Sequence, residues 1–500
     1  MKIMSASQMR EWDAFTLREE PVASLDLMER AATSCYNWIL SHGWVDKPFH
    51  IFCGKGNNGG DGLALARLLL QQGKQVTVYI LENGNKGTDD FQSNLHRLHP
   101  LTFGIHFIQS EAFFPQLEKN AVVVDALFGT GLQRPLQGVA ALLVQHINQS
   151  GATVLSIDLP SGMYADENSS QLPRIHAAHT LTFQAWKLCF LMEENHESFG
   201  EVHLLDIGLH PDFETAVPVS ARLTDVSIIR SIRKVRSPFS HKGHFGHALL
   251  VGGSYGKMGA MVLASRSCLQ SGAGLVTAFI PSSGYAVLQT AVPEAMVQCD
   301  KNSIHISTLP NEIWRFQAVG VGPGMGLQEE TGSVLLQLLK ELHQPVVLDA
   351  DALNLLSIVQ EGASYLPPES ILTPHPKEFE RLCGSVTNNF ERMERAREKA
   401  KEWNCYIVLK THHTLIACPD GRLWFNSTGN AGMAKAGSGD VLTGLLTGLL
   451  AQGYTPEQAC ILGVYLHGLA GDLAAAQVGQ EAMIASDTLQ MTGAAFRSIY

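Results

Sequence analysis

The segment CGKGNNGGDG, residues 53–62, lies between the apolar run FHIF and the helical pattern LALARLLLQQG. Gly54, Gly56 and Gly59 match G-x-G-x-x-G, the pattern of a dinucleotide-binding turn, in its strand–turn–helix setting. The match suggests a chain that uses NAD as a redox cofactor. The two amides and the carboxylate of NNGGD argue against that use, because they crowd a turn that needs only backbone. The rest of the chain has to decide.

Apolar strand-like runs alternate with helical patterns along the whole chain, which predicts parallel sheets covered by helices on both faces. In the first half, strands are predicted over residues 50–53, 75–80, 121–127, 152–159, 179–183 and 202–208. A second series is predicted over residues 247–253, 275–280, 318–322, 345–351, 370–376, 405–410 and 414–420, followed by helices over 439–453 and 456–477. We therefore expect two α/β domains, residues 1–222 and residues 223–500.

Length and charge restrict the function. Five hundred residues exceed the size of one core, and 36 Lys and Arg against 47 Asp and Glu give a net charge of −11. This balance argues against nucleic-acid binding.

The nine cysteines form no C-x-x-C, which is typical of buried thiols in a reducing cytosol rather than of a zinc site or a disulfide framework. The N-terminal residues lack the apolar stretch of a signal peptide, and no apolar span of about 20 residues is expected. The prediction is a cytoplasmic protein that contacts no membrane.

Three predicted strands of the first half end in polar, glycine-rich segments, where ligands of open α/β sheets bind. Asn58, Asp125 and Ser161 could hold a monovalent or divalent cation through oxygen atoms. Asp158 could then act as general acid or base, and Lys187 could stabilise an anion. The main-chain N–H groups of residues 129–135 could wrap a phosphate. The alternatives are that both aspartates are helix or turn caps and that Lys187 is a solvent-exposed lysine.

The second half carries another glycine-rich loop, AKAGSGDVLTG, residues 434–444, at the start of a helix. Its N–H groups could bind a transferring phosphoryl group, with Asp440 taking a proton from a substrate hydroxyl. No G-x-x-x-x-G-K-[ST] is present, so a nucleotide here would not be bound by a P-loop. Further candidates follow other predicted strands: Gly322, Asp349, Asp351, His375, Glu378, Lys410 and Thr414.

Other motifs have competing interpretations. Gly252, Ser254 and Gly256 fit G-x-S-x-G, the turn that carries a hydrolase nucleophile. The histidines 241, 244 and 247 suggest a metal, but their spacing across a glycine-broken segment fits no standard site. His412 and His413 are expected on a hairpin surface, and His467 is expected to be a core residue of an apolar helix.

The segments GKGNNGGDGLALAR, VDALFGTGLQRPL, SIDLPSGMYAD and LTFQAWK resemble the signature segments of the NAD(P)HX epimerase domain, over most of residues 1–215. That family interconverts the R and S forms of hydrated NADH or NADPH on a Rossmann-like fold, here a three-layer sandwich. The resemblance implies that Asn58, Asp125 and Ser161 hold K⁺ and that Asp158 is the acid or base that contacts the substrate. It implies nucleotide binding by Asn57, Asn58, Gly59, Gly60, Asp61, Gly129, Thr130, Gly131, Leu132, Gln133, Arg134 and Pro135.

The segments HKGHFGHALLVGGSYGKMGAM, VGPGMG, LDADALN, LTPHPKEFERL and NSTGNAGMAKAGSGDVLTGLL resemble the ADP- or ATP-dependent NAD(P)HX dehydratase of the ribokinase-like superfamily, over most of residues 235–475. The resemblance implies a ribokinase-like α/β fold. The residues it implies for the hydrated nucleotide are Ala260, Gly322, His375 and Asp440. Those it implies for ADP are Lys410, Thr411, His412, His413, Thr414 and Gly439.

The resulting hypothesis is a bifunctional enzyme that repairs NADHX and NADPHX, using K⁺ in the first domain, Mg²⁺ in the second and ADP as co-substrate. Asp158, Lys187 and Asp440 are its candidate catalytic residues. It is expected to form a homo-oligomer. The alternative is a ribokinase-like kinase of a small alcohol with a non-catalytic nucleotide-binding N-terminal domain. A phosphorylated alcohol as the final product would distinguish it.

Overall fold

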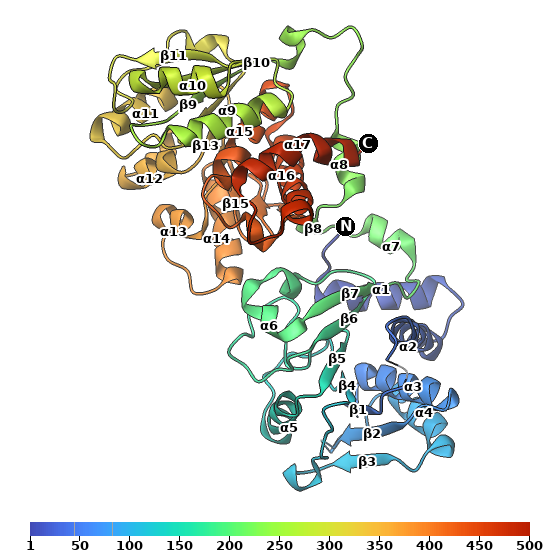
Figure 1. Ribbon diagram of the computed structural model, residues 1–500. Helices are drawn as coiled ribbons and strands as arrows, with labels where there is room; N and C mark the ends of the chain where they lie inside the picture. The colour runs from blue at the N-terminus through green and yellow to red at the C-terminus, as the bar shows by residue number, and fades with distance from the viewer. Residues whose placement is uncertain (45, 83) are drawn as a thin grey trace. The chain divides into compact units, whose positions relative to one another are not determined.

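The computed structural model describes residues 1–44, 46–82 and 84–500. Met1–Val219 form one compact unit, and Ser220–Thr387 with Glu391–Tyr500 form a second (Figure 1). The predicted domain boundary at residue 222 stays a prediction; this position lies within strand β8, which belongs to the sheet of the second unit.

The first unit is built on seven parallel strands in the order β3-β2-β1-β4-β5-β6-β7. The order reverses between β1 and β4, as in a Rossmann fold, which confirms the predicted architecture. The strands are β1 (Phe49–Cys53), β2 (Val76–Leu81), β3 (Ile105–Ile108), β4 (Val122–Ala126), β5 (Thr153–Ile157), β6 (His179–Phe183) and β7 (Glu201–Leu205). β3 is the one strand of this sheet that the sequence pattern missed: its residues are half-buried or exposed except Ile108, as on a sheet edge.

Helices cover both faces of this sheet. Phe91 of α4, Cys35 of α2 and Leu63 of α3 share one core with Ile51, whereas Leu143 of α5 lies in a separate core on the opposite face. The helices are α1 (Ala6–Glu19), α2 (Ser24–Ser41), α3 (Asn57–Gln71), α4 (Asp89–Leu98), α5 (Gly138–Gln149), α6 (His196–Phe199) and α7 (Pro211–Ala216). The three layers place the carboxyl ends of β1, β4, β5 and β6 at one edge.

The second unit has ten strands in the order β11-β10-β9-β12-β13-β14-β15-β16-β17-β8. Pairing is parallel from β11 to β15, and β16 runs antiparallel to both of its neighbours. The strands are β8 (Ala221–Leu223), β9 (His247–Val251), β10 (Leu275–Pro281), β11 (Met296–Asp300), β12 (Ala318–Val321), β13 (Val346–Leu348), β14 (Ile371–Leu372), β15 (Tyr406–Leu409), β16 (Leu415–Ala417) and β17 (Leu423–Phe425). The strand predictions missed β8, β11 and β17, which are short or lie at the edge of the sheet.

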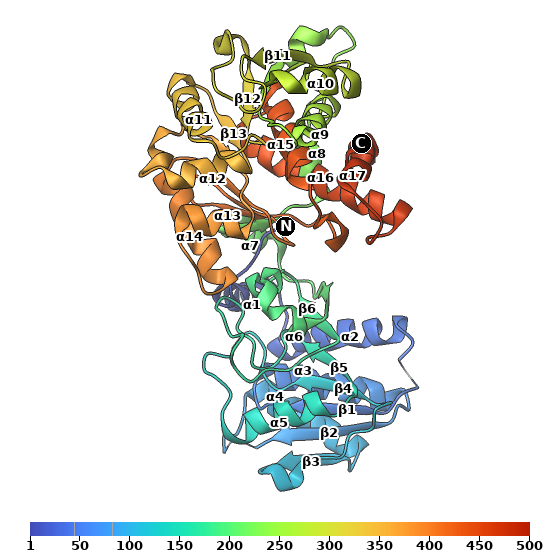
Figure 2. The ribbon, with the colours of Figure 1, turned by 60° about the vertical axis from the view of Figure 1, so that its left-hand side comes forward.

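Helices flank this sheet as well. α9 and α15 pack on one side, and α11 and α12 lie on the other (Figure 2). The helices are α8 (Val226–Ile232), α9 (Met258–Gln270), α10 (Tyr285–Ala291), α11 (Glu329–Glu341), α12 (Asp351–Ile358), α13 (Pro376–Cys383), α14 (Asn389–Glu402), α15 (Ser438–Ala451), α16 (Pro456–Val478) and α17 (Ala485–Ser498). The two predicted closing helices correspond to α15 and α16, and α17 follows them.

Helix α16 corrects the expectation that the chain has no apolar span of about 20 residues. Among the described residues it is the one helix that is long and apolar enough to cross a membrane, with a mean hydropathy of 1.5. However, 67% of its apolar window is buried inside the unit, where it packs against α15 and α17. Its composition is therefore that of a core helix.

The glycines of the opening segment allow β1, its turn and α3 to approach β4 closely. A Cβ at Gly54 would lie 1.9 Å from the carbonyl oxygen of Leu127, and one at Gly59 would lie 1.8 Å from that of Gly54. A Cβ at Gly62 would lie 2.6 Å from the Ala126 side chain. The G-x-G-x-x-G pattern therefore indicates close backbone packing at the sheet edge and does not identify a particular ligand.

This packing predicts that Gly54→Ala destabilises the first unit, because the new methyl group meets backbone that cannot move aside. We expect a cost of at least about 1–3 kcal/mol, seen as a lower midpoint in calorimetric unfolding of the full chain. Gly56→Ala is the matched control, since nothing lies within 4 Å of a Cβ there and its φ of −93° suits alanine. Equal midpoints for the two variants would contradict the prediction.

Candidate active sites

In the first unit, the end of β4 is held to the segment after β5 by Asp125 and Ser161. The buried Asp125 carboxylate accepts four hydrogen bonds. Its Oδ1 is bonded by the Ser161 hydroxyl at 2.5 Å and the Leu127 N–H at 3.3 Å, and its Oδ2 by the Ser156 hydroxyl and the Ser161 N–H at 2.8 Å each. Burial raises the pKa of Asp125, and these hydrogen bonds oppose that rise. Asp125 and Ser161 thus join the end of β4 to the segment after β5 through the buried carboxyl group of Asp125.

Asn58, in the first turn of α3, lies beside this edge with both polar atoms of its amide buried and without a hydrogen-bond partner. A Cβ at Gly129 would lie 3.3 Å from the Asn58 amide oxygen and 2.6 Å from Asp158 Oδ2. The structure therefore brings Asn58, Gly129 and Asp158 together, whereas the grouping of Asn58 with Asp125 and Ser161 around a cation stays a prediction. An orphaned buried amide is costly in a folded protein, and it is commonly satisfied by a ligand, an ion or water.

Asp158 directly follows β5 and adopts φ +66°, a conformation that a non-glycine residue rarely takes. Its Oδ2 accepts the Thr130 N–H at 2.8 Å, and its Oδ1 lies 3.2 Å from Lys187 Nζ. Lys187 is fully buried and also donates to Thr182 Oγ1 at 2.6 Å and to the Phe183 carbonyl at 2.9 Å. The alternative of a solvent-exposed Lys187 is therefore wrong.

Residues 129–135 form the loop after β4, and Asn57 to Asp61 form the first turn of α3. Most of the loop residues are half-exposed or exposed, and its tie to Asp158 is the Thr130 N–H. α3 begins without a side-chain cap at Gly56, so its first N–H groups are available to an anion. Asp61 lies in that turn, where burial first and then repulsion from Asp158 and Asp13 raise its pKa.

Asp13 is a residue that the sequence reasoning missed. It lies on α1, and burial followed by repulsion from Asp158 raises its pKa to about 6, whereas Lys187 lowers it. Asp13, Asp61 and Asp158 thus form a group of acids around one buried lysine. The only signal in the sequence was a carboxylate next to Trp12 in an amphipathic helix, which also describes an ordinary surface acid.

In the second unit, an ion pair between the half-buried Lys410 and the buried Asp349 joins two strand ends to α15. Lys410, directly after β15, lies 2.7 Å from Asp349 Oδ1 after β13, and the Thr443 hydroxyl of α15 donates to Asp349 Oδ2 at 2.8 Å. Glu378 Oε2 is 4.0 Å from Lys410 Nζ. Burial alone would raise the pKa of Asp349, but Lys410 and its hydrogen bonds lower it overall. This network holds a lysine at the sheet edge.

The glycine-rich loop meets that network at the start of α15. A Cβ at Gly439 would lie 3.2 Å from both Asp349 Oδ2 and Lys410 Nζ. The helix starts after Gly437 at φ +93° with no side-chain cap. The Ser438 N–H donates to the Lys435 carbonyl at 3.4 Å, and the N–H groups that follow it in the first turn face an anion site. Asp440 follows, and its pKa is raised to about 7 by burial and then by Asp349, while Lys410 opposes the rise. A carboxyl that titrates near neutrality can act as a general base.

Gly322 follows β12 and His375 follows β14, the two strands that flank β13. His375 caps α13: its Nδ1 accepts the Lys377 N–H at 3.1 Å, and its own N–H donates to Glu378 Oε2 at 2.9 Å. Gly322 has φ +126°, and a Cβ there would lie 1.9 Å from the Asp349 carbonyl. A Cβ at Gly324, in the same loop, would lie 3.2 Å from that of Ala260. These contacts place Gly322 beside Asp349 and the Gly324 turn beside Ala260.

Residues 411–414 form the turn between β15 and β16. The Thr411 hydroxyl donates to the His413 carbonyl at 3.0 Å, and the Thr414 hydroxyl to the Thr411 carbonyl at 3.2 Å. His412 is exposed, as predicted, whereas His413 is half-buried with its Nδ1 3.1 Å from the Asn426 carbonyl. The turn therefore presents Lys410 at the sheet edge, and its own side chains mainly hold the turn together.

His467 was predicted to be a core residue, but it lies beside the glycine-rich loop. Its Nε2 is 3.3 Å from the Ser438 hydroxyl at the start of α15. Burial, followed by repulsion from Lys410, lowers its pKa to about 4. This position could not be predicted from the sequence, because the helix around His467 is apolar on every side.

The competing motifs lose support. The Ser254 hydroxyl donates to the Gly324 carbonyl at 2.8 Å rather than to a histidine. His247 Nε2 pairs with the Thr277 hydroxyl at 2.8 Å, on β10. His241 and His244 stack at 3.9 Å between ring centroids without a converging third ligand in the described chain. The G-x-S-x-G pattern here marks a tight turn after β9.

Comparison with known proteins agrees with this geometry in both units. Residues 248–492 match the family described as NAD(P)H-hydrate dehydratase, and residues 24–189 match the YjeF-related protein N-terminus. The bifunctional NAD(P)H-hydrate repair enzyme of Moorella thermoacetica is 36% identical over 515 residues, covering 100% of this chain and 97% of the relative. That of Thermofilum pendens is 34% identical over 512 residues, with 100% and 97% covered.

Among solved structures, a ribokinase-like superfamily protein from Enterococcus faecalis V583 aligns with a TM-score of 0.50 at 28% identity, covering 56% of this chain and 96% of that one. The ribokinase-like fold predicted for the second unit is thereby confirmed. Because both halves match and full-length relatives align from end to end, the chain belongs to the family of bifunctional NAD(P)H-hydrate repair enzymes.

Proposed function

We propose that this chain restores hydrated NADH and NADPH to the reduced dinucleotides. The first unit interconverts the R and S epimers, and the second unit dehydrates the S epimer with ADP, giving NAD(P)H, AMP and phosphate. The observation that carries the proposal is the pairing of two separate strand-end sites, Asp158 with Lys187 and Asp440 with Lys410, in a chain of this family. A dehydratase that accepts one epimer benefits from a partner that supplies it from the other.

In the first unit, Asp158 takes the proton of the hydroxyl group at the hydrated carbon while the bond from that carbon to the ring nitrogen opens to give an aldehyde. It returns the proton when the nitrogen closes on the other face of that aldehyde, which inverts the carbon. The left-handed backbone of Asp158 turns the carboxylate toward the loop after β4, where the Thr130 N–H and Lys187 hold one oxygen each. The N–H groups of that loop and of the first turn of α3 bind the dinucleotide phosphates. Lys187 Nζ, 3.2 Å from Asp158 Oδ1, holds the carboxylate in its orientation.

A potassium ion fits the residues next to this site. Asn58 offers a buried amide oxygen without a partner, and Asp125 and Ser161 offer further oxygen atoms from two neighbouring strand ends. Asp125 already accepts four hydrogen bonds, so the Ser161 hydroxyl has to turn to share the ion. When bound, the ion would supply positive charge beside the desolvated Asp125. It would also give the buried Asn58 amide oxygen the partner that it lacks.

In the second unit, Asp440 removes the proton from the hydroxyl of the S epimer. The hydroxyl oxygen attacks the terminal phosphorus of ADP, the bond to the bridging oxygen breaks, and AMP leaves. The ring carbon next to the phosphorylated one then loses a proton as the carbon–oxygen bond breaks, which forms the double bond and releases phosphate. Lys410 and the N–H groups of α15 would bind the phosphoryl oxygens, and Glu378, whose Oε2 is 4.0 Å from Lys410 Nζ, would help to hold Mg²⁺, which neutralises the charge of the phosphates.

One assay tests both reactions. An R and S mixture of hydrated NADH is incubated with the full chain, Mg²⁺, K⁺ and ADP, and the nicotinamide absorbance, AMP and phosphate are measured. We expect complete recovery of NADH with one AMP and one phosphate for each molecule. Recovery of half of the substrate, with slow spontaneous epimerisation, would refute the epimerase. A phosphorylated product that accumulates without NADH would instead support a kinase.

The raised pKa of Asp440 predicts how dehydration depends on pH. A general base must be ionised, and a carboxyl with a pKa of about 7 is protonated below that pH. We therefore expect kcat/KM for the S epimer to be level above pH 7 and to fall about tenfold per unit in more acid solution. Rates at low substrate concentration between pH 5.5 and 8.5 test this.

The Asp351→Asn variant is the control for this profile. Asp351 is one of the charges that raise the pKa of Asp440, so its neutralisation should move the midpoint to lower pH. A profile that is flat down to pH 5.5 while the protein stays folded would contradict the assignment of Asp440 as the base.

A further inference from the structure

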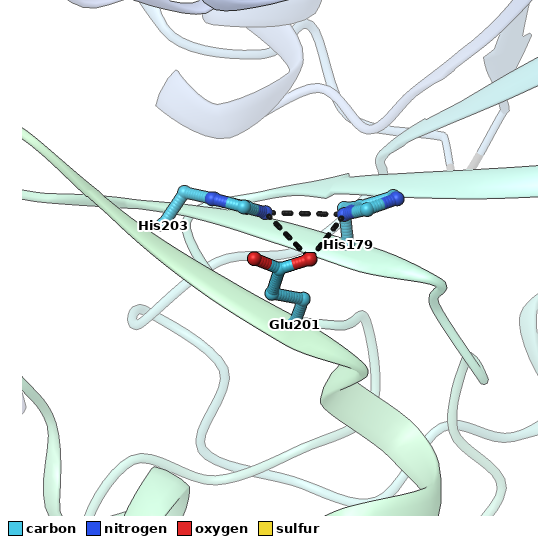
Figure 3. Close-up of side chains that lie close together, drawn as sticks. All are labelled: His179, Glu201 and His203. Carbon is cyan, nitrogen blue, oxygen red and sulfur yellow. Dashed lines mark hydrogen bonds and ion pairs between the residues drawn. The ribbon is translucent and has the colours of Figure 1, made fainter. Parts of the chain in front are cut away.

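Three potential metal ligands converge on the first unit, away from the site just described. His179 begins β6, and Glu201 and His203 lie on the neighbouring strand β7 (Figure 3). In the parallel register His179 is paired with Glu201, and His203 follows two residues later on the same face. The sequence reasoning did not single out any of the three, because 22 residues separate His179 from Glu201.

The distances between the three ligand atoms suit a metal ion. His179 Nδ1 lies 3.1 Å from His203 Nε2 and 3.7 Å from Glu201 Oε2, and His203 Nε2 lies 3.9 Å from the same Oε2. A triangle with these sides has a circumradius of about 2.1 Å, which equals the usual Zn–N and Zn–O distances. One point is therefore at bonding distance from all three atoms without movement of the backbone.

The surroundings provide a rigid wall and an open side. The Trp38 ring packs 4.7 Å from His203 and 5.3 Å from His179, and the Trp44 ring packs 5.1 Å from His179. The two imidazoles are thus largely buried, whereas the Glu201 side chain is 69% exposed. Aromatic packing explains the ring positions, but it does not require two ring nitrogens and a carboxylate oxygen to meet at one point.

Two further titratable groups lie at this wall in the described chain: Lys47, whose Nζ is 5.7 Å from the Trp44 ring centroid, and His42. The His42 ring stacks on Trp38 at 3.8 Å and lies 5.8 Å from the His203 ring, between centroids. Its Nδ1 is already 2.8 Å from the Trp38 carbonyl. The exposed Glu201 side chain leaves the site open to solvent on its side.

We propose that His179, Glu201 and His203 form a binding site for a divalent transition-metal ion of the zinc type. Two imidazoles and one carboxylate are a ligand set that zinc accepts with a fourth position open. The ion would tie the first residues of β6 and β7 together at the edge of the sheet. The other end of β6 carries Thr182 and Phe183, which accept hydrogen bonds from Lys187, so the site lies at the opposite end of the strand from the chemistry.

The test is a zinc titration of the full chain after removal of metals with EDTA, without nucleotide or Mg²⁺. We expect one equivalent of Zn²⁺ at this site and a rise of about 5 °C in the unfolding midpoint of the first unit at a hundredfold excess over Kd. His203→Gln should weaken this binding at least tenfold and abolish the midpoint shift. Glu201→Gln is the second variant, because its exposed side chain can change without loss of packing.

His244→Gln is the matched control, since it removes an imidazole from the other close histidine pair and should leave the titration unchanged. The proposal is overturned if wild type shows no zinc-dependent shift, or if His203→Gln and Glu201→Gln both retain the wild-type affinity. Loss of the site in His244→Gln would equally overturn it, because the bound zinc would then lie elsewhere.

Discussion

Asparagine in place of Asp440 is expected to lower the rate of ADP-dependent dehydration by about 10²–10⁴-fold, the usual contribution of a general base. The amide is nearly the same size as the carboxylate but cannot take the hydroxyl proton. Asp440 is half-buried at the start of α15, next to the Lys410–Asp349 pair, and it is the member of that group whose pKa lies near 7. NADH formation from the S epimer measures the loss.

The same chain provides the control for this variant. Asp440→Asn should still interconvert the R and S epimers at the wild-type rate, because the first unit has its own site. Its unfolding midpoint should not fall, since the substitution removes an acid whose charged form is disfavoured by burial. Undiminished NADH formation would refute the role of Asp440 as the base, and a joint loss of both activities would point to misfolding.

The strand ends could be predicted from the sequence because their signals are local. Asp125, Asp158 and Lys410 each directly follow an apolar run, and parallel strands deliver such residues to one edge of the sheet. The G-x-G-x-x-G match correctly predicted a tightly packed turn. At Gly54 and Gly59 a backbone oxygen lies less than 2 Å from the place where a Cβ atom would be, so only glycine fits. In the family to which the chain belongs, however, the dinucleotide is the molecule repaired, so the pattern did not identify a redox cofactor.

The remaining features depend on contacts between distant segments. Asp13 on α1 joins Asp158 across more than 140 residues, and no periodicity distinguishes it from a surface acid. The buried Lys187 lies 3.2 Å from Asp158, which follows a different strand, β5. The convergence of His179 with His203 needs the register of β6 against β7. These relations are set by the tertiary fold, which a single sequence does not show.

Asp158→Asn is expected to abolish use of the R epimer, with a loss of about 10²–10⁴-fold in epimerisation, while dehydration of the S epimer continues. The asparagine amide oxygen can still accept the Thr130 N–H, so the loop after β4 keeps its position. What is lost is the group that takes and returns the proton. The measurement is NADH formation from R-enriched substrate with excess Mg²⁺ and ADP, compared with formation from the S epimer.

This variant also leaves the buried Lys187 without its carboxylate, 3.2 Å away in the wild-type chain. Removing one partner of a buried ion pair lowers the free energy of unfolding by about 3–5 kcal/mol. The first unit of the variant should therefore unfold at a lower temperature. Combining Asp158→Asn with Lys187→Met removes both charges and should restore much of that stability but none of the epimerisation. If the double variant regained epimerisation, Asp158 would act only through the fold, and its role in the proton transfer would be refuted.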